Sequence, residues 1–141
     1  MKKPAERIPD TNAIIRYLLG DHPTLSPRAV EFFSRVRTGE QKVLILESVI
    51  AEAVYVLTKA YAVPRAKVAS GLTGLLNYRG VINPDRASLL DALALFGAGK
   101  LDIVDCVLIA RARRERGEPF SFDRDLLKEF DSSRGGIQET P

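Results

Sequence analysis

Four acidic residues in this sequence occur where their carboxylates could meet and bind a metal ion. Asp10 and Asp123 directly follow short apolar runs, Glu52 lies one turn into a predicted helix, and Asp105 lies in the first turn of another. Carboxylates held close together repel and raise one another's pKa, and a hard divalent cation relieves that repulsion. Oxygen ligands suit Mg²⁺ or Mn²⁺ better than Zn²⁺. A metal held in this way lowers the pKa of a bound water and stabilises charge on a phosphoryl group, which is the chemistry of a metal-dependent nuclease or phosphatase.

The composition excludes several other kinds of site. The single cysteine, Cys106, and the single histidine, His22, rule out a disulfide framework, an all-cysteine zinc site and a zinc site with two histidines. The net charge of +3, from 21 basic and 18 acidic residues, is weak evidence for a polyanionic partner. No apolar run approaches the ~18 residues of a membrane span, and no signal-peptide pattern begins the sequence. We therefore expect a protein of a reducing cytoplasm.

Short apolar runs alternate with helical patterns along the chain. The patterns predict strands at 7–9, 43–46, 81–82 and 120–122, and helices at 11–19, 28–37, 49–61, 64–77, 83–96, 102–116 and 123–130. This alternation favours an α/β fold with a parallel sheet and helices on both faces. Sites in such sheets form outside the carboxyl ends of the strands, so the four acids are expected at one edge. We expect one domain over 1–130 and a polar, frayed tail over 131–141.

Each acid also has a purely structural interpretation. Asp10 and Asp123 can cap the helices that follow them, and Asp102 with Asp105 approaches a capping box. Glu52 can lie on the solvent-exposed stripe of its helix. Taken singly these interpretations compete with the metal site, and only the joint arrangement of the acids favours the latter.

Four segments carrying these acids resemble, in order, the motifs of PIN-domain proteins, and in particular the VapC-type toxins of prokaryotic toxin–antitoxin pairs. The segments are 8–19, 47–57, 101–110 and 120–126, and they span nearly the whole chain. Asp10, Glu52, Asp105 and Asp123 take the acid positions of the four motifs in turn.

The resemblance implies a PIN-like fold, with a central parallel sheet of four or five short strands flanked by helices. It implies Mg²⁺ or Mn²⁺ at the four acids and a single-strand endoribonuclease in which water attacks the phosphodiester in line, leaving 5′-phosphate and 3′-hydroxyl ends. It also implies a homodimer, a cognate antitoxin protein, and tRNA or ribosomal RNA as substrate.

Further residues match supporting positions of the resemblance. Asn12 and Ser121 fit positions that hydrogen-bond the acidic site, and Asp102 could reach it from the preceding turn. Arg16 and Arg124 lie near the acids in sequence and could contact RNA phosphate, although a salt bridge with a neighbouring acid is the alternative for each.

Two departures from the motif pattern concern the sheet. Pro9 lacks an N–H, so the first strand should stop by Ile8. After Phe130, only Ile137 is available for a last strand.

Two other functions remain open on the sequence. The same metal site could serve a phosphatase, although Asn12 stands where an aspartate-dependent phosphatase would have its second acid. Alternatively, the chain could be a non-catalytic PIN-like interaction module that keeps its acids for folding.

The helices between residues 48 and 77 are also rich in apolar residues. We expect part of this surface to form a dimer interface or an antitoxin groove, the alternative being intramolecular core. The residues concerned are Val54, Tyr55, Leu57, Tyr61, Leu72, Leu75 and Leu76.

Overall fold

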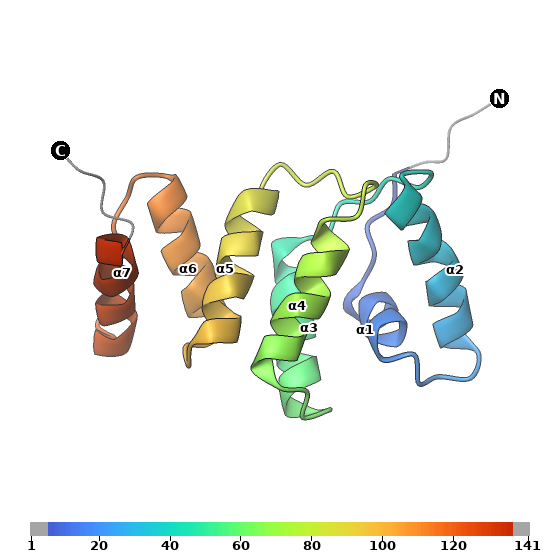
Figure 1. Cartoon of the computed structure of the whole chain (residues 1–141), viewed down its shortest axis with the longest axis horizontal. Helices are drawn as coiled ribbons and strands as arrows, with labels where there is room; N and C mark the ends of the chain where they lie inside the picture. The colour runs from blue at the N-terminus through green and yellow to red at the C-terminus, as the bar shows by residue number, and fades with distance from the viewer. Residues whose placement is uncertain (1–5, 137–141) are drawn as a thin grey trace.

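The computed structural model describes residues 6–136, and it folds this part of the chain mainly into helices. The helices are α1 (Thr11–Leu19), α2 (Leu25–Thr38), α3 (Glu47–Lys59), α4 (Arg65–Leu76), α5 (Arg86–Ala98), α6 (Ile103–Arg114) and α7 (Arg124–Gly136). They form an elongated molecule with α7 at one end and α1 and α2 at the other (Figure 1).

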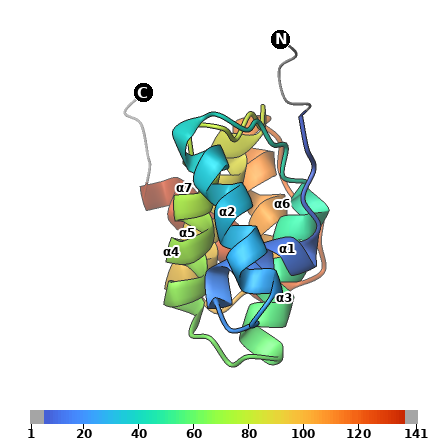
Figure 2. The same ribbon diagram turned by 90° about the vertical axis from the view of Figure 1, so that its right-hand side faces the viewer.

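The middle of the molecule is a group of four helices in two layers. Helix α3 packs on α4, α4 on α5, α5 on α6, and α6 back on α3. Figure 2, which looks along the long axis, places α4 and α5 on one side and α3 and α6 on the other. Helices α1 and α2 pack on one another, and α1 also packs on α3. Helix α3 therefore links the first half of the chain to α6.

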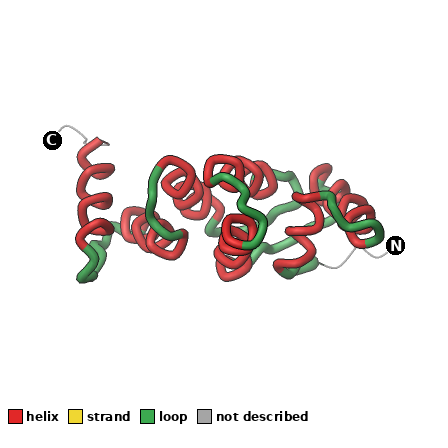
Figure 3. The backbone as a smooth tube through the Cα atoms, turned by 90° about the horizontal axis from the view of Figure 1, so that it is seen from below, coloured by secondary structure: helices red, strands yellow, loops and turns green. Residues whose placement is uncertain are grey.

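The predicted α/β fold with a central parallel sheet is wrong for the residues that the structure describes. Three extended segments meet only through isolated parallel bridges, one between Arg7 and Val43 and one between Val43 and Val81. Val43 N–H donates to the Gly80 carbonyl at 2.8 Å, and the Val43 carbonyl accepts from Ile82 N–H at 2.9 Å. Figure 3 accordingly shows helices and loops and no strand.

Side chains explain why these bridges do not extend into a sheet. Directly after the bridge at Val81, the Asn83 side chain takes the place of backbone: its Oδ1 accepts from Ile45 N–H at 2.9 Å and its Nδ2 donates to the Ile45 carbonyl at 2.7 Å. On the other side, Pro9 follows the bridge at Arg7 and has no N–H to donate. The segments predicted as strands thus lie beside one another over about one residue each.

The fourth predicted strand, at 120–122, pairs with no described residue. It belongs to the segment 117–123, here called the aromatic arm, which joins the end of α6 to the start of α7. Phe120 and Phe122 are 88% and 91% exposed. The aromatic arm therefore carries two large apolar side chains in solvent.

The main hydrophobic core is built from α1 to α6 and the buried bridge residues, with Phe33, Ile14, Ile45, Leu72 and Leu93 among its fully buried side chains. A smaller cluster of Ile109, Leu126 and Phe130 holds α7 to α6. Leu95 of α5 and Leu101 pack against the same cluster, so α7 is attached through α6, α5 and the turn between them.

Most of the apolar surface predicted for a partner is core instead. Of the seven residues, Val54, Leu57, Leu72, Leu75 and Leu76 are buried. Only Tyr55, at 63%, and Tyr61, at 41%, are markedly exposed. For five of the seven, the alternative of intramolecular packing is the one found.

Helix boundaries differ modestly from the predicted ones. The range of α1 is as predicted, and α1 ends at Gly20, whose φ of 63° suits glycine. Helix α3 begins at Glu47, two residues before the predicted start at 49, and ends at Lys59, two residues before the predicted end at 61. Helix α7 continues to Gly136, so the described part of the expected tail is largely helical. Ile137, considered for a last strand, lies outside the described residues. No described helix is long and apolar enough to cross a membrane.

Candidate metal site

The first and second predicted acids lie together beside α1. Thr11 Oγ1 donates a hydrogen bond to Glu52 Oε1 at 2.5 Å, which ties the start of α1 to the middle of α3. Asp10 and Glu52 line one open groove of about 480 Å³, together with Asn12, Arg16 and Tyr61. The structure thus brings together two carboxylates, Asp10 and Glu52, that are far apart in sequence.

Local structure explains the position of each acid in this first pair. Asp10 has extended backbone and caps α1, with its Oδ1 accepting from Ala13 N–H at 2.9 Å. On α3, Glu52 follows Val49 by three residues and precedes Val56 by four, and this spacing places the three side chains on the face towards α1. Asp10 is therefore a helix cap, as its structural interpretation suggests, and it also lines the groove.

Arg16 is occupied by contacts within the protein. Its guanidinium forms an ion pair with Asp21 at 3.0 Å and donates to the Tyr61 hydroxyl at 2.6 Å, and the side chain is only 13% exposed. The salt-bridge alternative is thus the one found for Arg16. By contrast, Arg124 is exposed at the first residue of α7.

The third and fourth acids lie together at the start of α6. Burial and the negative charges of Asp123 and Asp102 raise the pKa of Asp105 above its ordinary value. Asp123 caps α7, since its Oδ1 accepts from Asp125 N–H at 2.9 Å and from Leu126 N–H at 3.1 Å. Ser121 supports it, with Oγ accepting from Asp123 N–H at 3.0 Å. Asp102 occupies the cap position of α6, although its side chain makes no capping hydrogen bond.

The structure shows the four acids as two pairs. Asp10 and Glu52 lie on α1 and α3, whereas Asp105 and Asp123 lie at the starts of α6 and α7. Within residues 6–136, no three side chains of His, Cys, Asp or Glu lie close enough to hold a metal ion together. A single site formed by all four acids remains a prediction.

The donor chemistry nevertheless fits a hard divalent cation. Asp10, Glu52 and Asp123 each use one carboxylate oxygen in a positioning hydrogen bond and leave the other without a hydrogen bond to any described residue. None of the four acids forms an ion pair with a described Lys or Arg. Capping and metal binding are therefore compatible roles, because they use different oxygens of the same carboxylate.

The sequence did not predict the site roles of two residues that line the groove. Thr11 positions Glu52, and its place directly after Asp10 is the signal that could have indicated this role. Tyr61 lies beyond the end of α3 and meets Arg16 only through the packing of α1 on α3, so its local sequence contains no such signal.

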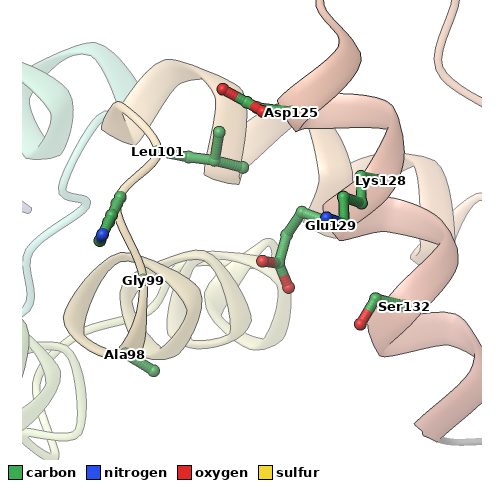
Figure 4. A pocket seen from close by; sticks show the side chains of 8 residues that line it. Ala98, Gly99, Leu101, Asp125, Lys128, Glu129 and Ser132 are labelled. Atoms are coloured by element: carbon green, nitrogen blue, oxygen red, sulfur yellow. The ribbon is translucent and has the colours of Figure 1, made fainter.

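A separate pocket of about 450 Å³ lies between α7 and the turn that joins α5 to α6 (Figure 4). Asp125, Lys128 and Glu129 line it from α7, opposite Gly99 and Leu101. It holds none of the four candidate acids. Asp125 is exposed and close in sequence to Asp123 while lining this other pocket, which makes it a suitable control residue.

Comparison with known proteins gives one match. The family model described as PIN domain matches residues 7–132, a range that includes all four acids. Proteins with this domain are generally metal-dependent nucleases, and they usually bind divalent metal ions. Neither a curated protein nor a solved structure shows a significant match to the chain.

Proposed function

The chain belongs to the PIN domain family, and on that premise we propose that it is a Mg²⁺- or Mn²⁺-dependent endoribonuclease. Its substrate in this proposal is single-stranded RNA, and its metal ligands are Asp10, Glu52, Asp105 and Asp123. One observation supports the proposal most strongly. Asp10, Glu52 and Asp123 are each held by a hydrogen bond to one oxygen and keep the second oxygen available.

The chain's own residues have two tasks in this reaction. Thr11 and the first turns of α1 and α7 fix the directions of three carboxylates. These carboxylates would therefore reorient little when a metal ion binds. The carboxylates would also accept a hydrogen bond from the attacking water and orient it, because the single histidine, His22, bonds to backbone at the start of α2. A bound divalent cation would supply the stabilisation of charge on the phosphoryl oxygens.

The same proposal extends to a toxin of a toxin–antitoxin pair. Its support is the resemblance of the four acid-bearing segments to VapC-type toxins, together with the family match over 7–132. In this role the protein would act in the cytoplasm on tRNA or ribosomal RNA, as a homodimer neutralised by a cognate antitoxin. Of the seven apolar residues considered for such contacts, Tyr55 on α3 and Tyr61 directly after it are the two that are exposed.

Cleavage of an end-labelled single-stranded RNA tests the nuclease activity. We expect EDTA to abolish cleavage by the wild-type protein and Mg²⁺ or Mn²⁺ to restore it. Asp10→Asn and Asp123→Asn should each lower the rate by several orders of magnitude, because ligand charge is lost. Asp125→Asn is the matched control and should act mildly, since Asp125 contributes only its backbone N–H to Asp123.

The products separate this mechanism from its rivals. Attack by water leaves 5′-phosphate and 3′-hydroxyl ends. Full activity in EDTA, or 2′,3′-cyclic phosphate ends, would contradict the proposal, because cyclic ends mean that the ribose hydroxyl attacked. For the toxin role, expression in a bacterial host should arrest growth, and the Asp10→Asn variant should not.

A further inference from the structure

The aromatic arm exposes two phenylalanine rings beside one of the candidate catalytic acids. Phe120 and Phe122 alternate with Ser121, whose hydroxyl accepts from the backbone of Asp123. The two ring centroids lie 5.5 Å apart with the planes inclined at 67°. An isolated exposed apolar residue is common on protein surfaces, but two adjacent rings that are almost fully exposed usually indicate a binding surface.

The ends of the aromatic arm define a path on the surface. The arm begins where α6 ends, with Gly117 N–H donating to the Ala112 carbonyl at 2.7 Å. It finishes at Asp123, whose charge acts on Asp105 in the first turn of α6. The arm therefore spans the length of α6, which is about 18 Å for 12 residues. An extended single strand of nucleic acid would cover that length with a few nucleotides.

Cationic groups lie at both ends of this path. Arg111, Arg116 and Arg124 are exposed, and none of them forms an ion pair with a described residue. By contrast, Arg114, also on α6, is paired with Asp91 at 2.8 Å. Glu118 is the only acid between Arg116 and Phe122. Exposed rings flanked by unpaired guanidinium groups are the usual components of surfaces that bind single-stranded nucleic acid.

We propose that Phe120 and Phe122 form a stacking platform for two bases of single-stranded RNA, with Arg116 and Arg124 contacting the phosphates on either side. The proposal rests on the nuclease activity proposed above and assigns the substrate contacts next to Asp123. Stacking tolerates every base because each has a π-face, so the platform gives affinity and position with little sequence preference.

A single tryptophan can report on this platform directly. The chain contains no Trp, so Phe122→Trp introduces a unique fluorophore and keeps an aromatic ring at the site. In EDTA, where cleavage is suppressed, we expect emission typical of a water-exposed indole and strong quenching by a 12-nucleotide single-stranded RNA. An abasic oligonucleotide of equal length, with phosphates but no bases, should quench far less.

Affinity measurements provide the second test. The Phe120→Ala/Phe122→Ala variant should bind the same RNA at least about tenfold more weakly, given the usual contribution of a base–aromatic stack. Val30→Ala removes an exposed apolar side chain from α2, at the other end of the molecule, and should bind like the wild type (Figure 1). Unchanged affinity in the double variant would overturn the proposal.

The remaining outcomes identify what else could cover the rings. Emission typical of a buried indole that depends on protein concentration would mean that a second copy of the chain covers the aromatic arm, and it would refute the RNA platform. Binding of the RNA without quenching of the Phe122→Trp fluorescence would also refute the RNA platform. If the double alanine variant binds normally and the wild type cleaves, the platform fails and the nuclease stands. If the wild type binds through the rings but never cleaves with Mg²⁺, the nuclease fails and the platform stands.

Discussion

Asn83 is predicted to be among the most important polar residues for the stability of this protein. Its buried side-chain amide satisfies both backbone groups of Ile45, with hydrogen bonds of 2.9 Å and 2.7 Å, and its Nδ2 also donates to Asp85 Oδ1 at 2.9 Å. Ile45 is itself fully buried. The Asn83→Ala variant would therefore leave a buried N–H and a buried carbonyl without partners.

The expected cost follows from those two groups. An unsatisfied buried polar group costs about 1–3 kcal/mol, so Asn83→Ala should lower the free energy of unfolding by about 2–6 kcal/mol. A domain of this size has a total stability of about 5–15 kcal/mol, so the loss is a large fraction of it. With a urea m-value of about 2 kcal/mol/M, the midpoint should fall by about 1–3 M.

Urea denaturation of the wild type and two variants measures this loss. Asn77→Ala is the matched control, since Asn77 is exposed after α4 and its side chain makes no hydrogen bond to a described residue. It should change the free energy by less than about 0.5 kcal/mol. If Asn83→Ala cost no more than Asn77→Ala, the explanation given above for the missing sheet would be wrong.

Three further predictions concern charge, packing and metal binding. Burial and two neighbouring carboxylates raise the pKa of Asp105, so in buffer with EDTA and no added metal Asp105→Asn should raise the melting temperature at pH 7. The gain should vanish as pH falls below the ordinary pKa, where Asp105 is protonated in the folded and unfolded states alike. Gly80→Ala should cost about 1–3 kcal/mol in urea, because its Cβ would lie 2.1 Å from the Gln41 carbonyl oxygen. Gly74→Ala meets no atom within 4 Å and should be neutral or slightly stabilising. Mg²⁺ or Mn²⁺ at about 100 times its Kd should add about 2.7 kcal/mol of stability, detected as a higher melting temperature. Asp10→Asn should reduce that gain, and a wild-type melting temperature indifferent to millimolar metal would argue against a formed site.

Helices were predictable because their signals are local. Asp10 and Gly20 mark the two ends of α1, and both act there as the sequence suggests. The sheet was not predictable because pairing between distant segments decides it. The apolar run 43–46 is typical of a buried strand, yet Asn83 occupies the backbone groups of Ile45 with its side chain. A side chain that takes the hydrogen bonds of a neighbouring strand leaves no periodic pattern in the sequence.

The sequence motifs supply the residue types of the candidate site, whereas its geometry could be predicted only in part. The motif around Asp10 and the motif around Glu52 indicate acids of one site, and the structure places these two on one groove. The contact of Arg16 with Asp21 is local, whereas its contact with Tyr61 depends on how α1 packs on α3. The alternation of Phe120 and Phe122 suggests a half-buried strand, and their exposure depends on the absence of a partner segment among residues 6–136.

The central claim is that the pair on α1 and α3 and the pair at the starts of α6 and α7 act on one scissile phosphate. The most direct measurement is the Mg²⁺-dependent cleavage rate of single-stranded RNA by Asp10→Asn, by Asp123→Asn and by the variant that carries both substitutions. Residues that act as one unit show strongly non-additive losses. We therefore predict that each single variant loses several orders of magnitude in rate and that the double variant loses scarcely more. If the two losses multiply in the double variant, or if either single variant cleaves like the wild type, the two pairs do not form one site.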